Sequence, residues 1–273
     1  MGGARAAPPI PLFVTSRWQA ADMDPSPGWP TTELLAFDLE TTGVDRFHDV
    51  PVSYALVVMR GGVLESSESA IVDPGREVPV AATAIHGITT ERARTEGMAL
   101  TDAVTHVGGR LVDASRRGVA IVGMKLDYDL TMLDCCYRRI LGKGLADDGF
   151  CGPVLDALVL DRHFDRYRKG KRTLGDLCAE YGVAIEHAHD AVADATATLE
   201  VLGAMCRRYP ELAAAPLADL HRSQTGWHRE WATSFSAWRA GRGLPPLDER
   251  DGDWPIAFFE SGTSRPGVTV AAV

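Results

Sequence analysis

The sequence predicts a mixed α/β fold, and two features of the chain predict it. Three strand-like apolar runs come first, at residues 34–39, 52–59 and 63–72, with a Gly-rich hairpin turn at 60–62 between the last two. From about residue 99 to residue 208, short apolar strands then alternate with helical patterns. Strands in hairpins followed by strand–helix alternation are typical of a mixed sheet flanked by helices.

The second half of the pattern predicts helices and strands in turn. Helical spacing indicates helices at about 99–116 and 128–141, and the second of these ends at Gly142. The other predicted elements are strands at 118–123 and 154–156 and helices at 157–164, 173–181, 190–208 and 211–241.

Composition divides the chain into three parts. Residues 1–31 carry many Pro, Gly, Ala and Ser without periodicity, which predicts a flexible N-terminal arm. Residues 32–209 hold the α/β pattern, and residues 210–273 are predicted to be a C-terminal helical extension and tail. In that extension, a helically spaced stripe of apolar side chains predicts a face that packs against the domain or a second subunit. A base-stacking surface is the less favoured alternative. The stripe comprises Leu220, Trp227, Trp231, Phe235 and Trp238.

Charge and cysteine usage limit the class of protein. The net charge of −9 and the pI near 5.4 exclude a generally basic nucleic-acid binder but leave room for a local basic patch. No run of 18 apolar residues is present, so we expect no transmembrane helix and a soluble, cytoplasmic protein. The cysteines have no zinc or disulfide spacing and are expected to be small buried residues: Cys135, Cys136, Cys151, Cys178 and Cys206.

Two carboxylates stand at the end of the first strand. Residues i and i+2 of a strand point to the same face, so Asp38 and Glu40 can reach one small volume. Two close carboxylates repel each other, and a hard cation such as Mg²⁺ or Mn²⁺ removes that repulsion. A pair of solvated acids at a strand end is the plainer alternative.

Further acids lie in two other segments. Residues 187–195 offer His189, Asp190 and Asp194, with Asp190 in a helix N-cap position and Asp194 in the first turns of that helix. In the middle of the chain, Asp129 opens a helix, and Asp127 is an equal candidate for its cap. On its own, neither segment identifies a site.

In combination, these segments resemble the DEDDh branch of the DnaQ-like 3′–5′ exonucleases. The first family motif, F-D-x-E-T-T-G, is matched by residues 37–43, and the last, H-D-A-x-x-D, by residues 189–194. The middle motif, an aromatic residue followed by Asp and a Leu four positions later, is matched by Tyr128, Asp129 and Leu133. This match selects Asp129 over Asp127 as the third acid.

The resemblance implies an RNase H-like fold for an exonuclease domain at 32–209 and two-metal hydrolysis at the 3′ end, with Mg²⁺ or Mn²⁺ as the cations. Carried onto this chain, Asp38 would bridge both ions, Glu40 and Asp194 would hold the ion that activates water, and Asp129 would support the second. His189 would be the general base, since histidine titrates near neutral pH. The expected products are nucleoside 5′-monophosphates.

The resemblance also implies contacts to the terminal nucleotide. They are expected from Leu39, Thr41 and Thr42 just past the first motif and from His86 in the segment A-I-H-G-I-T. Plain turn chemistry also explains Thr42 and the following glycine, and the two explanations are compatible.

One segment departs from the family. The family commonly has His-Asn-Ala before the aromatic residue of the middle motif, whereas this chain has Met124, Lys125 and Leu126. None of the family residues there is an expected metal ligand, so the chemistry should survive. Lys125 is predicted either to contact a phosphate or to point into solvent.

A basic stretch at residues 165–174 is the best candidate for gripping a nucleic-acid backbone, and a solvated loop is its alternative. The residues assigned to this contact are Arg168, Lys169 and Lys171.

Three functions remain open at this level. The leading one is a 3′–5′ exonuclease acting on nucleic acid with a free 3′ end, single-stranded DNA favoured, with a DNA polymerase as a further candidate partner. The second is a weakly catalytic nucleic-acid- or polymerase-binding module on the same fold, supported only by the altered middle motif. The third is an exoribonuclease, because the same carboxylates serve DNA and RNA. The oligomeric state stays open.

Overall fold

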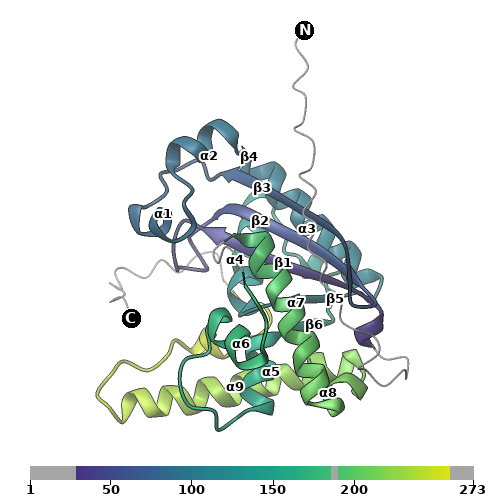
Figure 1. Ribbon diagram of the computed structural model, residues 1–273. Helices are drawn as coiled ribbons and strands as arrows, with labels where there is room; N and C mark the ends of the chain where they lie inside the picture. The colour runs from purple at the N-terminus through teal and green to yellow at the C-terminus, as the bar shows by residue number, and fades with distance from the viewer. Residues whose placement is uncertain (1–28, 186–189, 259–273) are drawn as a thin grey trace.

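A six-stranded mixed sheet forms the centre of the molecule (Figure 1). The structure is a computed structural model that describes residues 29–185 and 190–258. The strand order is β4-β3-β2-β1-β5-β6. Strand β2 runs antiparallel to both β1 and β3, whereas β5 and β6 run parallel to β1, and β4 runs parallel to β3. The predicted mixed sheet is therefore confirmed. The strands are β1 (Glu33–Thr41), β2 (Pro51–Arg60), β3 (Val63–Asp73), β4 (Met98–Ala99), β5 (Ala120–Gly123) and β6 (Val154–Asp156).

The helices follow the predicted pattern, with additions. The two helices before residue 99 and strand β4 were not predicted, because segments of seven residues or fewer are too short to show periodicity. No helix of the described residues combines the length and hydropathy needed to cross a membrane. The α-helices are α1 (Val80–His86), α2 (Thr90–Glu96), α3 (Leu100–Arg116), α4 (Leu126–Leu141), α5 (Ala157–Phe164), α6 (Leu174–Tyr181), α7 (Ala191–Arg208), α8 (Pro210–Ala214) and α9 (Leu217–Ala240).

Two apolar cores lie on the two faces of the sheet. In β1, Leu35 and Phe37 face the core shared with α3 and α4. Leu34 and Ala36 face the core shared with α5, α6 and α7. This alternation follows from the two-residue period of a strand, and it makes the molecule a three-layer α/β/α arrangement (Figure 1).

All strands except β2 run in the same direction, so their carboxyl ends meet at one edge of the sheet. Helix α1 follows β3, α4 follows β5, and α5 follows β6. The first turns of these helices therefore lie near the end of β1. In open α/β sheets this edge is where ligands bind.

The residues just before the predicted boundary at residue 31 pack against the domain. Residues 1–28 lie outside the described part, but Trp29–Thr31 forms a short 3₁₀ helix. Trp29 is only 6% exposed, and its Nε1 donates a hydrogen bond to the carbonyl of Leu212 at 3.1 Å. A large ring buried in the core fixes this stretch to the domain.

The C-terminal extension packs on the same domain rather than standing apart from it. Helix α9 contacts α5 and β6, and the buried Gln224 accepts from the N–H of Asp156 and donates to the carbonyl of Val154. The face of α9 that is buried consists of Leu220, Gln224, His228 and Ala232.

The aromatic stripe predicted on α9 is only partly a packing face. Trp227 packs against both cores and stacks on His163, with ring centroids 3.6 Å apart. Trp231, Phe235 and Trp238 stack on one another instead, at 5.4 and 5.5 Å between centroids, and Trp238 is 47% exposed. Two members of the buried face are polar, so apolar periodicity did not reveal it.

All five cysteines are free thiols, and four of them are buried as expected. Cys151 is exposed, contrary to the prediction, because it lies in the connection before β6 rather than in a core-facing element.

Replacement of Trp29 by Ala tests whether residues 29–31 belong to the domain. We expect Trp29→Ala to lower the free energy of unfolding by about 3–5 kcal/mol, because it empties a buried site and removes a hydrogen bond. Trp238→Ala is the control and should cost about 1 kcal/mol or less, since that ring is half exposed. Urea denaturation measures the free energy of unfolding of both variants. Equal small losses would place residues 29–31 outside the domain.

Candidate active site

Asp38 and Glu40 lie at the carboxyl end of β1, on the face that packs against α7. They continue the row of Leu34 and Ala36, whose side chains enter the core shared with α7. The pairing of β1 with β2 shifts register directly after Glu40. The strand period thus directs both carboxylates to one side, where the sheet opens.

Asp194 approaches these two acids from the first turn of α7. Asp190 caps this helix, accepting from the N–H groups of Val192 and Ala193 at 3.1 Å each, as predicted. Carboxylate oxygens of Asp38, Glu40 and Asp194 lie within 4.8 Å of one another. His189, the predicted general base, lies outside the described residues.

Asp129 comes from the first turn of α4. The cap of this helix is not Asp127: the N–H groups of Lys125 and Leu126 donate to the buried carboxylate of Asp156 at 3.0 and 2.8 Å. Asp127 forms an ion pair with Arg46 at 2.8 Å instead. Asp129 lies near enough for its charge to raise the pKa of Asp38, but it is not one of the three described acids whose oxygens lie within 4.8 Å of one another.

Burial first, and neighbouring negative charge second, raise the pKa values of three of these carboxyl groups. Burial raises the pKa of Asp38 well above its usual range, and the charges of Asp129, Asp194 and Glu40 raise it further. Burial and then Asp194 raise the pKa of Glu40 to about 7. Burial and then Asp127 raise the pKa of Asp129. A site of converging oxygen ligands with excess negative charge fits a hard divalent cation.

The turn after β1 is built by side chains of the first motif. Thr42 is 2% exposed, and its hydroxyl donates to Asp49 at 2.7 Å. A Cβ on Gly43 would lie 2.6 Å from a carboxylate oxygen of Asp49, so a larger residue there would displace the carboxylate that holds Thr42. Turn chemistry therefore accounts for the hydrogen bonds of the Thr42 hydroxyl. Thr41 is half-buried and shares a hydrogen bond with the Tyr128 hydroxyl at 3.1 Å.

Leu39 and His86 lie differently with respect to this edge. The Leu39 side chain is buried in the core with α3 and α4, so only its backbone is placed to meet a nucleotide. His86 is the last residue of α1, and its Nδ1 accepts from the N–H of Ile88 at 3.1 Å. Figure 1 shows α1 beside the end of β1.

Lys125 occupies a left-handed backbone conformation, with φ of 61°, and among the described non-glycine residues it is alone in doing so. Asparagine adopts this conformation far more readily than lysine does. The backbone conformation thus explains why the family commonly has Asn at this position. The exposed Lys125 ammonium lies 5.3 Å from the centroid of the Tyr128 ring.

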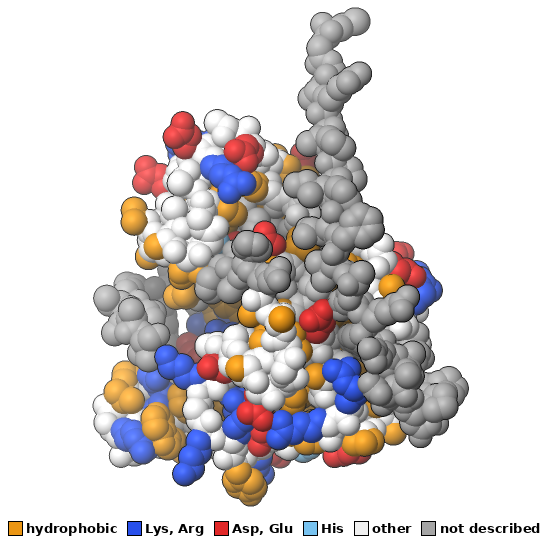
Figure 2. All heavy atoms as spheres, viewed as in Figure 1, with side chains coloured by type: hydrophobic (Ala, Val, Ile, Leu, Met, Phe, Trp, Pro, Cys, Tyr) orange, Lys and Arg blue, Asp and Glu red, His pale blue; other side chains and the backbone are white. Residues whose placement is uncertain are grey.

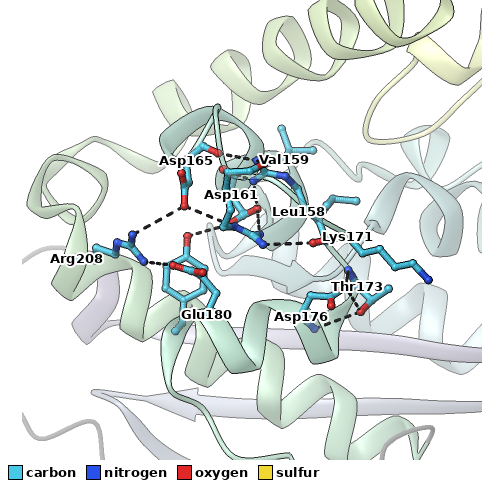
Figure 3. Close-up of polar contacts among 12 residues, drawn as sticks. Leu158, Val159, Asp161, Asp165, Lys171, Thr173, Asp176, Glu180 and Arg208 are labelled. Carbon is cyan, nitrogen blue, oxygen red and sulfur yellow. Dashed lines mark hydrogen bonds and ion pairs between the residues drawn. The ribbon is translucent and has the colours of Figure 1, made fainter. Parts of the chain in front are cut away.

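The basic stretch contains two kinds of cation (Figure 3). Arg168 and Arg172 point inward and pair with Asp161, whose side chain is fully buried; the Arg168 contact is 2.7 Å. Tyr181 donates to the same carboxylate at 2.9 Å. The charge of Arg168 is thereby neutralised inside the protein, so its predicted contact with a substrate phosphate is replaced by a structural one.

Other residues of the basic stretch at 165–174 point outward. Lys169 and Lys171 are exposed and form no ion pair with any described residue, and Figure 3 shows the Lys171 side chain extending away from the network. Tyr167 is 88% exposed. The inner arginines thus hold a loop that presents two lysines and an aromatic ring to solvent.

Two residues next to the site were missed from the sequence. Asp156 follows a strand and precedes an apolar helix, and this N-cap signature could have revealed it. Arg46 shows no local signal, because its partners lie 81 and 205 residues away.

The raised pKa of Glu40 predicts how the metal-free protein responds to pH. The ordinary pKa of this carboxyl is 4.5, and in the folded state it is about 7. The folded protein therefore holds the Glu40 proton more tightly than the unfolded chain does. The associated stability is complete below about pH 4.5 and is lost as the pH rises through about 7. With chelator present, we expect the melting temperature of the wild type to fall relative to Glu40→Gln between about pH 5 and pH 8. Thermal scans measure this difference; parallel curves for the two proteins would contradict it.

Comparison with known proteins places this geometry in a family. The RNase T family profile, described as "Exonuclease", matches residues 35–202. The PolC-type DNA polymerase III of Lacticaseibacillus paracasei is 32% identical over 181 residues, which cover 64% of this chain and 11% of that protein. A DNA polymerase III subunit epsilon-like protein of Rhodobacter capsulatus is 32% identical over 192 residues, 67% of this chain and 25% of that protein. The chain thus matches a quarter or less of the length of these relatives.

Solved structures agree on the fold. Exonuclease I of E. coli in complex with a dT13 oligonucleotide is 21% identical with a TM-score of 0.58, covering 66% of this chain and 42% of that one. The family profile covers more than half of the chain, and its range includes Asp38, Glu40, Asp129 and Asp194. This chain therefore belongs to the RNase T/DnaQ-like exonuclease family.

Proposed function

We propose that this protein is a cytoplasmic, metal-dependent 3′–5′ exonuclease that releases nucleoside 5′-monophosphates from the 3′ end of single-stranded DNA. The observation that carries the proposal is the convergence of Asp38, Glu40 and Asp194 within 4.8 Å, in a chain of an exonuclease family. The exonuclease domain comprises residues 32–209, with the packed extension beyond it.

The carboxylates fit two divalent cations, Mg²⁺ or Mn²⁺. Asp38, Glu40 and Asp194 would hold one cation, and Asp38 with Asp129 would hold the second. When bound, a pair of such cations stabilises both the attacking and the leaving oxygen of an in-line displacement. The raised pKa values of Asp38 and Glu40 support this assignment, because they record negative charge that a cation would offset.

His189 is the proposed general base in this branch of the family. In the sequence it directly precedes Asp190, the cap residue of α7, and Asp194 follows four residues after that cap. Its imidazole would take the proton from the attacking water, a task suited to a group that titrates near neutral pH.

The substrate end of the site is proposed to use backbone as well as side chains. Thr41, the backbone of Leu39 and Thr42, and His86 would contact the terminal nucleotide, and Lys125 would meet a phosphate beside Tyr128. Exonuclease I binds single-stranded DNA and the sequence relatives are DNA polymerase proteins, which favours DNA over RNA and a DNA polymerase as a partner.

Lys169 and Lys171 are proposed to grip the DNA backbone away from the scissile bond. They project from a loop that Arg168 and Arg172 fix to Asp161. Figure 2 shows Lys and Arg side chains gathered in the lower half of the view, over the region of α5, α6 and α9. An acidic protein needs such a local patch to hold a polyanion.

Cleavage of labelled single strands tests the chemistry. We expect the wild type to release mononucleotides from the 3′ end of DNA with Mg²⁺ or Mn²⁺ and not with EDTA. Asp38→Asn and Asp194→Asn should abolish release, because both remove cation ligands. His189→Ala should keep Mn²⁺ binding and lose about 10²–10⁴-fold in rate.

The control is the same oligonucleotide as RNA, with 5′-labelled strands to show direction. Faster release from RNA would change the substrate to RNA. Binding of strands without release, in protein that binds Mn²⁺, would replace the enzyme by a binding module.

Removal of the two loop lysines tests the backbone contact. In an Asp194→Asn background that does not cleave, Lys169→Ala with Lys171→Ala should weaken DNA binding most at low salt. The slope of log K against log salt should become shallower by about 1.4, because each phosphate contact on a single strand contributes about 0.7.

Lys143→Ala is the matched control, since this lysine pairs with Asp148 on another part of the chain. Fluorescence anisotropy at several salt concentrations measures all three proteins. An unchanged slope in the double variant would make the stretch a solvated loop.

A further inference from the structure

The C-terminal strap, which we define as residues 248–257, is tied to the elements that surround the acidic cluster. Trp254 is 5% exposed, and its Nε1 donates to the carboxylate of Asp156 at 3.4 Å. The N–H of Ala257 donates to the hydroxyl of Thr131, inside α4, at 2.9 Å. The strap therefore reaches both the residue that caps α4 and the body of that helix.

Arg46 makes the third connection, from the turn between β1 and β2. Its Nη1 donates to Asp127 in the first turn of α4 at 2.8 Å. Its Nη2 donates to Asp251 at 2.9 Å and to the carbonyl of Arg250 at 2.8 Å, both in the strap. The Arg46 side chain is only 10% exposed, so one buried guanidinium joins three segments that are distant in sequence.

Phe47 and His228 hold this junction from its two sides. The guanidinium carbons of Arg46 and Arg250 lie 5.1 and 4.3 Å from the centroid of the Phe47 ring. Buried His228 of α9 hydrogen-bonds the carbonyl of Asp251 through Nε2 at 2.9 Å. The strap is thereby supported by the extension as well as by the turn.

The start of α4 depends on contacts from outside the helix. The first four N–H groups of a helix have no partner within it, so its first turn is the part least fixed by its own hydrogen bonds. Here the residues on both sides of Asp129 are held by other segments. The holding pairs are Lys125 and Leu126 with Asp156, Asp127 with Arg46, Tyr128 with Gly43, and Thr131 with Ala257.

The position of Asp129 relative to Asp38, Glu40 and Asp194 depends on these contacts, because those three acids do not lie on α4. Asp38 and Glu40 are placed by β1, and Asp194 is placed by α7. Asp129 can share a cation with Asp38 only while the first turn of α4 keeps its position against the end of β1. Arg46 spans these two elements directly, from the turn after β1 to Asp127.

We propose that Arg46 is a positioning residue for Asp129, and that the C-terminal strap completes the active site by holding Arg46 in place. This proposal rests on the proposed function, because one of its tests measures exonuclease activity. Its other test measures cation binding and does not need activity. Arg46 touches neither substrate nor cation in it, and acts only by fixing the first turn of α4.

The experiment compares four proteins with the wild type: Arg46→Met, Arg46→Lys, Asp251→Asn and, as matched control, Arg138→Met. Arg138 pairs with buried Asp134 at 2.7 Å toward the opposite end of the same helix, so its loss disturbs α4 away from Asp129. Mn²⁺ affinity by calorimetry, unfolding in chelator, and kcat and KM on a single-stranded oligonucleotide are measured for each.

We expect Arg46→Met to lose about 10- to 100-fold in Mn²⁺ affinity and kcat, as for residues that orient metal ligands, with little change in KM. Arg46→Lys should recover part of this loss, because an ammonium keeps the charge but not the fork that meets Asp127 and Asp251 together. Asp251→Asn should show a smaller loss in the same direction. Arg138→Met should lower the unfolding midpoint while keeping the Mn²⁺ affinity.

Equal Mn²⁺ affinities in Arg46→Met and Arg138→Met would overturn the positioning role. If Arg46→Met does not fold, Arg46→Lys and Asp251→Asn decide, and wild-type affinity in both would overturn it as well. A wild type that binds Mn²⁺ but releases no nucleotide would refute the proposed function, while the Mn²⁺ affinities would still judge Arg46.

Discussion

Repulsion among four carboxylates at the end of β1 is the constraint to which the surrounding structure responds. Asp38, Glu40, Asp129 and Asp194 come from a strand and two helices, and burial raises the pKa of the first three. Nothing in the acids themselves favours their approach. Each element must therefore be fixed independently: β1 by its pairing with β2, α7 by its cap, and α4 by contacts from other segments.

The buried carboxylate of Asp156 has the largest share in fixing α4. It accepts from the first N–H groups of α4 and from those of α5, and it also accepts from Trp254. One side chain thus sets two helix starts and anchors the C-terminal extension. Gln224 holds the backbone on either side of the same strand end. The extension beyond residue 209 is for this reason packed against the strand end that carries Asp156.

The cations near the site divide into a buried and an exposed group. Arg46, Arg168 and Arg172 are largely buried and satisfy buried carboxylates, which suits a planar fork with several donors. Lys125, Lys169 and Lys171 are exposed, and so is Arg166 in the same basic stretch. A basic stretch in sequence is therefore not one surface: alternate members face the core, and the outward members alone can meet a polyanion.

The sequence by itself determined the mixed sheet, the strand end that bears Asp38 and Glu40, the Asp190 cap and the family, because these depend on local periodicity and on short motifs. Only the tertiary structure decided that Thr42 and Arg168 are used internally, that Asp156 caps α4, and that Arg46 and the strap meet there. Each of these contacts joins residues that sequence spacing does not relate. Local physics specifies elements and their faces, whereas the pairing of buried polar groups depends on how distant elements pack.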